Sequence, residues 1–312
     1  MEINLIVEPR KTYSWSVFKK RKPSYSIALD GIVLSPTRRA PKTPYAKKGP
    51  FANYDHHSGV DRAATLSTSA QVHLEINMGL FNAFSEDGIP KANIYVNDCD
   101  EDTCLAYWLL KNHERVNNHA EPLINQLVYC EDKLDVTAGA YPFGNIEMRR
   151  RMAWIFEPYN NARFNQTLHI MDAFGMKAIM EAVEKRIDEH VMGKGNELEL
   201  KGQYEIIEKS DLVTFVIESG PASRMQMYND GIDAFVALVA QKPDNYNVYV
   251  MGRRSVWTPF DLMKFARRFN KLEKRIITKN NQWGGSNTII GSPRRTGSLI
   301  SIPEMWELVV EG

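Results

Sequence analysis

The sequence predicts an α/β protein with a central, mostly parallel sheet and a smaller α/β domain at the C-terminal end. Short apolar segments that end in acidic residues alternate with segments of helical periodicity, which is typical of parallel strands joined by helices. The chain has 312 residues, of which 43% are hydrophobic, so two domains with their own cores are expected.

Three segments are predicted as strands that lead into carboxylates. Residues 25–30 form a short strand that ends at Asp30, residues 92–96 alternate in polarity, and residues 127–130 form a third apolar run. Open α/β sheets place their sites at the carboxyl ends of strands, so these carboxylates are expected on one side of the sheet. The acids after the second and third segments are Asp98, Asp100, Asp102, Asp132 and Asp135.

The helices between these segments are predicted from apolar spacing. Residues 63–84 carry Val72, Ile76, Leu80 and Phe84 on one face, and the hydroxyl-rich start of this segment offers backbone donors for an anion. A second helix follows Asp100 directly. Acidic residues there also complement a helix dipole, so capping remains an alternative to metal binding.

A long amphipathic helix is predicted over residues 170–191, and Gly193 and Gly195 end it. We place the domain boundary there, with one domain at 1–192 and the other at 196–312. The apolar positions of the helix are Met171, Phe174, Ala178, Ile179, Ala182 and Ile187.

The C-terminal domain is predicted to contain strands at 212–217 and 246–250, followed by a helix. Thr258 is the expected N-cap of this helix, because Pro259 and Asp261 follow at positions favoured in a first turn. The apolar residues Leu262, Phe265, Phe269 and Leu272 are expected to face a core.

Composition narrows the class of protein. No apolar run approaches 18 residues and no secretory signal is apparent, so a cytoplasmic location without membrane contact is expected. The three cysteines form neither a paired framework nor a zinc motif, which fits a reducing compartment. Residues 10–48 contain 11 Lys and Arg but only one acid, Asp30, which suits either a phosphate-bearing substrate or a solvated loop.

The tripeptide Asp55-His56-His57 is the most informative motif. Carboxylates suit hard cations and imidazoles suit transition metals, so the mixed set indicates Mn²⁺, Fe²⁺ or Zn²⁺. A polar turn would explain the tripeptide equally well on its own. The acidic residues after the predicted strands supply the further ligands that a metal site needs.

These motifs resemble the DHH phosphoesterases, which use two Mn²⁺-type ions to cleave phosphate esters or anhydrides. The resemblance implies that His56 is a metal ligand, that His57 contacts substrate phosphate, and that Asp55 serves both metal binding and catalysis. It further implies a bridging role for Asp30, with Mg²⁺, Fe or Zn as alternatives to manganese. The other ligands implied are the Asp100 and Asp102 motif, and Asp132 or Asp135.

The motif order differs from that of the family, in which the Asp-x-Asp motif comes first and follows a ligand histidine. Here it follows Asp55-His56-His57, and Val96 stands where that histidine is expected, with Asp98 as a substitute. Either the motifs are permuted relative to the family, or the acidic motifs do not correspond to those of the family.

A glycine-rich segment, residues 283–295, resembles the substrate-binding loop of the same family. Glycine lets backbone N–H groups approach an anion, and guanidinium groups match phosphate oxygens. A plain turn between strands is the alternative. The substrate-binding residues implied are Gly284, Gly285, Ser286, Arg294 and Arg295.

The function expected from the sequence is metal-dependent hydrolysis of a phosphodiester or phosphoanhydride, with 3'-5' exonuclease action on short oligonucleotides as one form of it. The implied partner is a phosphate-bearing small molecule or a short oligonucleotide, and a homodimer is a further candidate. The alternative is a non-catalytic protein that binds nucleotides or nucleic acid on the same fold.

Overall fold

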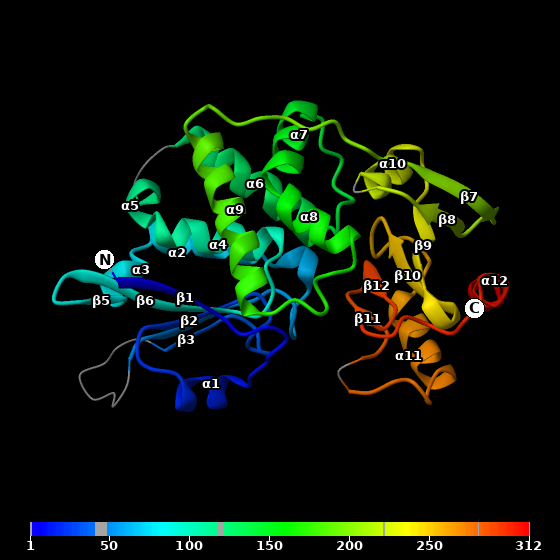
Figure 1. The fold of residues 1–312 in the computed structure, drawn as a ribbon, viewed down its shortest axis with the longest axis horizontal. Helices are drawn as coiled ribbons and strands as arrows, with labels where there is room; N and C mark the ends of the chain where they lie inside the picture. Colours follow the sequence, from blue (N-terminus) through cyan, green and yellow to red (C-terminus); the bar gives the residue numbers. More distant parts are fainter. Residues whose placement is uncertain (1, 41–48, 118–120, 221, 280, 312) are drawn as a thin grey trace. The chain divides into compact units, whose positions relative to one another are not determined.

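The computed structural model describes residues 2–40, 49–117, 121–220, 222–279 and 281–311. It divides into unit 1, Met1–Val136 with Asn145–Glu199, and unit 2, Thr137–Gly144 with Leu200–Gly312 (Figure 1). Ala140 lies in Thr137–Gly144, the short segment that belongs to unit 2, and it packs in the core of that unit. Part of the predicted basic segment, including Lys42, Lys47 and Lys48, lies outside the described residues.

Unit 1 contains a mixed six-stranded sheet with the order β1-β6-β2-β4-β3, in which β5 also pairs with β6. The first four strands in this order are parallel, and β3 and β5 are antiparallel to their neighbours. The strands predicted at 25–30 and 92–96 are confirmed as β2 and β6. The strands are β1 (Glu2–Val7), β2 (Ser26–Leu29), β3 (Arg38–Ala40), β4 (Phe51–Tyr54), β5 (Ser85–Glu86) and β6 (Ile89–Val96).

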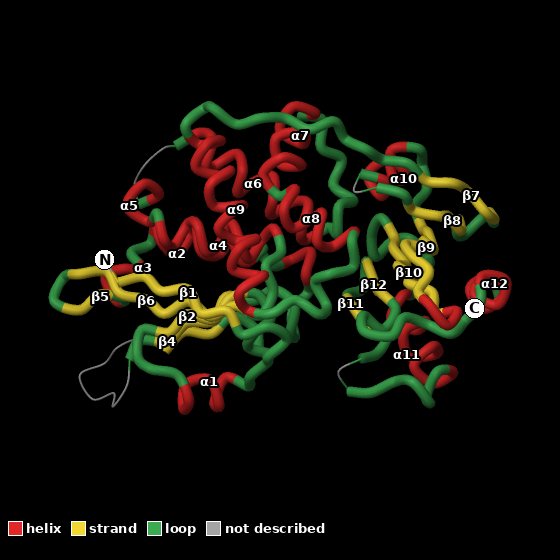
Figure 2. The backbone as a smooth tube through the Cα atoms, in the orientation of Figure 1, coloured by secondary structure: helices red, strands yellow, loops and turns green. Residues whose placement is uncertain are grey.

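Helices cover both faces of this sheet. The helix α1 (Trp15–Arg21) packs on one face through Phe18, which joins Ala28, Phe51 and Tyr95 in a buried cluster. Most of the other helices lie on the opposite face (Figures 1 and 2). The remaining helices of unit 1 are η1 (Arg62–Ala64), α2 (Thr68–Asn77), α3 (Leu80–Ala83), α4 (Glu101–Lys111), α5 (His113–Val116), α6 (Pro122–Val136), α7 (Ile146–Ile155), α8 (Glu157–Phe164) and α9 (Ala173–Val191).

The helix predicted over residues 63–84 is interrupted. The predicted apolar face is confirmed, since Val72, Ile76, Leu80 and Phe84 are all buried. The α-helix starts only at Thr68, however, and Gly79 separates α2 from α3 because it adopts a left-handed φ of 89°.

The strand predicted at 127–130 is wrong, because these residues lie within α6. Ile124, Leu127, Val128 and Glu131 are buried at helical spacing, whereas Tyr129 is half exposed. A run of four apolar residues is too short to separate a strand from part of a buried helix. Asp132 and Asp135 therefore come from a helix and not from a strand end.

The helix predicted at 170–191 is confirmed as α9, but its buried face is different. Met176, Met180, Val183 and Ile187 are buried, whereas Phe174 is 83% exposed. The helix begins after the N-cap Asp172, and its buried face contains Met176 and Met180.

Unit 2 contains a mixed six-stranded sheet with the order β11-β12-β10-β9-β8-β7. The strand β9 (Ala234–Lys242) alternates between two cores: Val236 packs on the side of α11 and α12, and Phe235 packs on the other side. The remaining elements are β7 (Tyr204–Lys209), β8 (Thr214–Glu218), α10 (Ser223–Asn229), η2 (Pro243–Asn245), β10 (Tyr246–Arg253), α11 (Leu262–Leu272), β11 (Gly284–Gly285), β12 (Ile289–Gly291) and α12 (Ile302–Val310).

The helix predicted after Thr258 begins later than expected. Asp261 is the N-cap of α11, because its carboxylate accepts hydrogen bonds from the N–H groups of Met263 and Lys264. Phe269 is buried as predicted, but Leu272 is 56% exposed and does not belong to the core. Among the described residues, no helix has both the length and the apolar character needed to cross a bilayer.

Candidate metal centre

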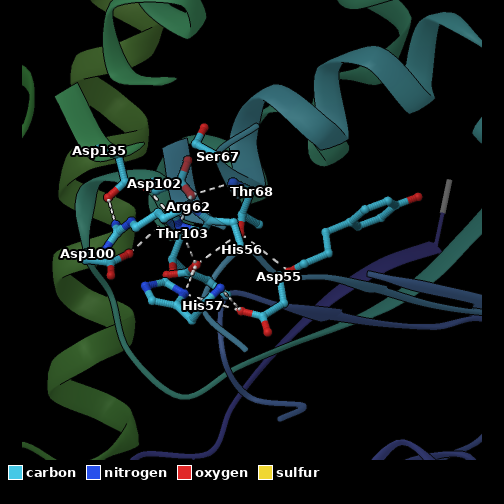
Figure 3. A network of polar contacts seen from close by, with 12 residues as sticks. Asp55, His56, His57, Arg62, Ser67, Thr68, Asp100, Asp102, Thr103 and Asp135 are labelled. Atoms are coloured by element: carbon cyan, nitrogen blue, oxygen red, sulfur yellow. Dashed lines mark hydrogen bonds and ion pairs between the residues drawn. The ribbon is translucent and has the colours of Figure 1, made fainter. Parts of the chain in front are cut away.

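The carboxyl ends of three neighbouring parallel strands form the candidate site in unit 1. Asp30 follows β2, Asp55-His56-His57 follows β4, and the acidic segment before α4 follows β6. Figure 3 shows His56, His57 and Asp102 gathered near Asp135. The predicted meeting of the strand-end residues is thus confirmed for Asp30, His56 and Asp102, whose ligand atoms approach one another.

His56 lies at the centre of the cluster. Its Nε2 atom is 2.8 Å from Asp135 Oδ2, 3.6 Å from Asp30 Oδ1 and 3.8 Å from Asp102 Oδ2. Two sets of potential metal ligands result, each with ligand atoms within 4.8 Å of one another. One set is Asp30, His56 and His57, and the other is His56, Asp102 and Asp135.

Among the described residues, no hydrogen bond fixes which ring nitrogen of His56 would bind a metal. Its side chain is fully buried, and within the described ranges neither ring nitrogen nor Asp135 Oδ2 has a hydrogen-bond partner of good geometry, although Nε2 and Oδ2 lie at ion-pair distance from each other. Buried polar atoms without partners are costly. A cation held between imidazole nitrogen and carboxylate oxygen would satisfy these atoms, so the donor set fits a divalent transition metal such as manganese.

The buried carboxyl groups of Glu131 and Glu101 near the cluster also favour a bound cation. Burial raises the pKa of Glu131, with the negative charges of Glu101 and Asp102 next in effect. Glu131 Oε2 has no hydrogen-bond partner, and burial also raises the pKa of Glu101. Buried carboxyls of this kind bind either protons or a cation.

Asp102 is held rigidly by the start of α2. Its two oxygens accept hydrogen bonds from the N–H groups of Thr68, at 2.6 Å, and Ser69, at 2.8 Å. Asp132 accepts another from Ser67 N–H at 2.8 Å. The backbone donors that the sequence offered to a bound anion are therefore occupied by carboxylates of the protein itself.

The ionisation of Asp102 is unfavourable in this position. Burial is the largest cause, and the charges of Asp135 and Asp30 add to it, so the pKa of Asp102 rises to about 6. Asp135 behaves differently: burial opposes its ionisation, but Arg62 and His56 lower its pKa.

Asp30 occupies a strained backbone conformation at the end of β2. Its φ of 46° lies in the left-handed region, which is uncommon for residues other than glycine and is found at functional sites. The hydroxyl groups of Thr68 and Thr103 donate to its carboxylate at 3.0 Å and 3.3 Å. Burial opposes ionisation, but His57 and then His56 lower the pKa of Asp30.

Asp55 closes the turn that carries the two histidines. Its Oδ1 accepts a hydrogen bond from His57 N–H at 3.0 Å and lies 3.3 Å from His57 Nδ1, and its Oδ2 accepts from Ser58 N–H. It belongs to neither ligand set. In this structure Asp55 orients His57.

His57 is the part of the motif that reaches solvent, because its side chain is 40% exposed. Its Nδ1 lies 3.2 Å from Asp30 Oδ1. Burial opposes protonation, but the charge and hydrogen bond of Asp30 raise the pKa of His57 to about 11. Asp30 therefore favours the protonated form of His57, which lies on the solvent-exposed side of the cluster.

The three aspartates after β6 have different roles. Asp98 Oδ1 accepts from Cys99 N–H, and Asp100 Oδ1 caps α4 by accepting from Thr103 N–H at 3.0 Å. Only Asp102 joins a ligand set. The capping alternative thus accounts for Asp100, whose pKa is raised first by burial and then by Asp30 and Asp98.

The structure separates the two aspartates of α6. Asp135 joins the set with His56, whereas Asp132 is held by Ser67 N–H and by Lys133 Nζ at 2.8 Å. Arg62, which the sequence reasoning missed, pairs with Asp135 Oδ1 at 2.5 Å (Figure 3). A single arginine in a short 3₁₀ turn leaves no periodic signal that could have singled it out.

The glycine-rich segment in unit 2 forms a hairpin. Gly284 and Gly285 pair with β12, and the N–H of Ser286 donates to Ile289 O. The N–H groups of Thr288 and Ile289 donate to Ser286 Oγ, so these donors serve the turn itself. Arg294 and Arg295 are exposed beyond it, and their role toward phosphate stays a prediction.

No family model matches the chain, and no curated protein or solved structure shows detectable similarity to it.

Proposed function

We propose that unit 1 binds a divalent cation and hydrolyses a phosphate ester or anhydride. The observation that supports this most is the position of His56, a buried imidazole whose nitrogens have no hydrogen-bond partner of good geometry among the described residues, while three carboxylates lie within 3.8 Å of Nε2. Manganese is one of the ions that suit this mixture of carboxylate and imidazole, and it also fits the resemblance to DHH phosphoesterases.

His56, Asp102 and Asp135 would hold the stronger ion, with Asp30 within reach. An imidazole nitrogen donates one electron pair, so His56 Nε2 serves one ion only. Asp30 and His57 would complete a second, weaker position together with substrate, once His57 has lost its proton. When bound, such ions supply Lewis-acid polarisation of the phosphoryl group.

The chain itself would orient and neutralise the substrate. Arg62 lies beside Asp135 and its side chain is 15% exposed, so the guanidinium can offer a charge-assisted donor to a phosphate oxygen. Before any second ion binds, protonated His57 adds positive charge at the exposed side of the cluster. Asp55 keeps the imidazole in this orientation.

The test combines metal binding with a substrate screen. Calorimetry with Mn²⁺ should show tight binding by the wild-type chain and by His169→Ala, a control outside the cluster, but not by His56→Ala. Short RNA, short DNA, cyclic dinucleotides and pyrophosphate should then be incubated with the Mn²⁺-loaded protein. Hydrolysis of one class that His56→Ala abolishes is expected.

Two results would contradict the proposal. If His56→Ala binds Mn²⁺ as tightly as wild type, the site is wrong. If Mn²⁺ binds at His56 and none of the substrates is hydrolysed, catalysis is refuted, and binding of a nucleotide without hydrolysis would favour the non-catalytic alternative.

A further inference from the structure

The helix α11 of unit 2 has a basic face opposite its buried face. Leu262, Phe265 and Phe269 pack into the core of the unit. Lys264, Arg267 and Lys271 are exposed, and their spacing of three and four residues places them on one side of the helix. Three more exposed basic residues follow the helix: Lys274, Arg275 and Lys279.

The acidic residues of this segment do not neutralise the basic face. Between residues 246 and 279 the acids are Asp261 and Glu273. Asp261 caps α11, and Glu273 is buried and accepts hydrogen bonds from Trp283 Nε1 and Ser298 Oγ. Within the part of the chain that the structure describes, Arg267, Lys271, Lys274, Arg275 and Lys279 form no ion pair.

An aromatic side chain projects from the loop that leads into this helix. Trp257 is 90% exposed, which is unusual for so large an apolar side chain. Arg253 anchors the loop, because its guanidinium donates to the carbonyl oxygens of Asn287, at 2.6 Å, and Thr258, at 3.0 Å. The loop therefore presents Trp257 to solvent from a fixed base.

We propose that α11, the residues that follow it and Trp257 form a surface for single-stranded nucleic acid. Arg267, Lys271 and the basic residues after the helix form no ion pair among the described residues, so together they attract a phosphate backbone, and an exposed indole can stack on an unpaired base. A membrane surface fits less well, since the apolar face of α11 is buried in the core and is not available for insertion. This surface lies wholly within unit 2 and does not depend on metal binding or on hydrolysis.

The proposal can be tested by fluorescence anisotropy with a labelled 20-nucleotide oligo(dT) and an RNA of equal length. EDTA is included, so that failure of the metal proposal cannot affect the result. The wild-type chain should bind at low salt, and its affinity should fall as salt rises. Neutralising two phosphate contacts, Arg267→Gln with Lys271→Gln, should reduce the slope of log affinity against log salt by about 1.4.

A matched control neutralises two exposed lysines on α9, Lys177→Gln with Lys185→Gln, and should bind like wild type. Trp257→Ala should weaken binding roughly 5- to 150-fold with little change in the salt slope, as expected for loss of one stacked base. Circular dichroism should show that all variants remain folded.

The proposal is overturned if the wild-type chain does not bind either oligonucleotide at low salt, or if the α9 control loses as much affinity as the α11 variant. Binding to anionic phosphatidylserine vesicles without binding to nucleic acid would assign the surface to membranes instead. Unchanged affinity in Trp257→Ala would remove the stacking contribution and with it the preference for single strands.

Discussion

His56 Nε2 lies 2.8 Å from Asp135 Oδ2 at ion-pair distance in the buried cluster of unit 1, although neither atom has a hydrogen-bond partner of good geometry among the described residues. The two residues come from a loop after β4 and from the last turn of α6. Such a close approach fits either an ion pair between protonated His56 and Asp135 or two ligands that share a cation. The pair is therefore the best place to test the metal centre.

The two aspartates of α6 provide a matched comparison. Asp135→Asn should weaken Mn²⁺ binding by at least roughly 10- to 100-fold, the loss usual even for residues that only support a ligand. Asp132→Asn should bind Mn²⁺ like wild type, because its side chain is engaged by Ser67 N–H and an amide oxygen can still accept that bond. Calorimetry measures both, and equal losses in the two variants would contradict the assignment.

Mn²⁺ affinity should increase with pH. Asp102 must lose a proton to act as a ligand, and its pKa is about 6, so affinity should rise as pH increases through this value. His56 adds to the effect, since burial opposes protonation but Asp135 and Asp30 raise its pKa, and the protonated ring cannot bind metal.

Titrations between pH 5 and 8 in buffers of different ionisation enthalpy should therefore show proton release on Mn²⁺ binding. The Asp132→Asn variant should give the same profile. Affinity that is constant over this range, or that increases in acid, would argue against Asp102 and His56 as ligands.

Local sequence patterns predicted the parts of the site that depend on strand ends. Asp30 and Asp102 follow confirmed strands, and neighbouring parallel strands bring their carboxyl ends together. The contribution of Asp135 could not be derived in this way, because it depends on the packing of α6 against the start of α2. The choice between Asp132 and Asp135 was also beyond local patterns, since both lie on the same helix.

Competition for hydrogen bonds explains the other differences. Asp100 caps α4 and Asp55 closes its own turn, whereas Asp102, which also accepts two backbone N–H groups, comes within 3.8 Å of His56. Short aspartate motifs serve turns and caps as readily as metals. Which of these roles an individual aspartate takes depends on tertiary contacts that spacing alone does not contain.

The core of unit 2 offers a test of the fold. Phe269 is fully buried, and the centroid of its ring lies 4.8 Å from that of Trp283. Phe269→Ala should therefore lower the free energy of unfolding by about 3–5 kcal/mol. Leu272→Ala, on the same helix but exposed, should change it by less than about 0.5 kcal/mol. Chemical denaturation compares the two, and a large loss for Leu272→Ala would contradict the observed helix register.

Arg62 should affect phosphate and metal in opposite ways. Its guanidinium competes with a cation for Asp135, so Arg62→Gln should bind Mn²⁺ at least as tightly as wild type. The variant also loses a charge-assisted donor, so pyrophosphate should bind the Mn²⁺-loaded protein more weakly by about 1.5–3 kcal/mol, or roughly 10- to 150-fold.

Arg39→Gln is the control for this experiment, because Arg39 is an exposed arginine of unit 1 that pairs with Glu75 on α2. It should leave both affinities unchanged. Calorimetry of Mn²⁺, and then of pyrophosphate into the Mn²⁺-loaded protein, separates the two effects of Arg62. A loss of Mn²⁺ binding with pyrophosphate affinity intact would instead make Arg62 a support of the metal ligands, with no direct contact to the substrate.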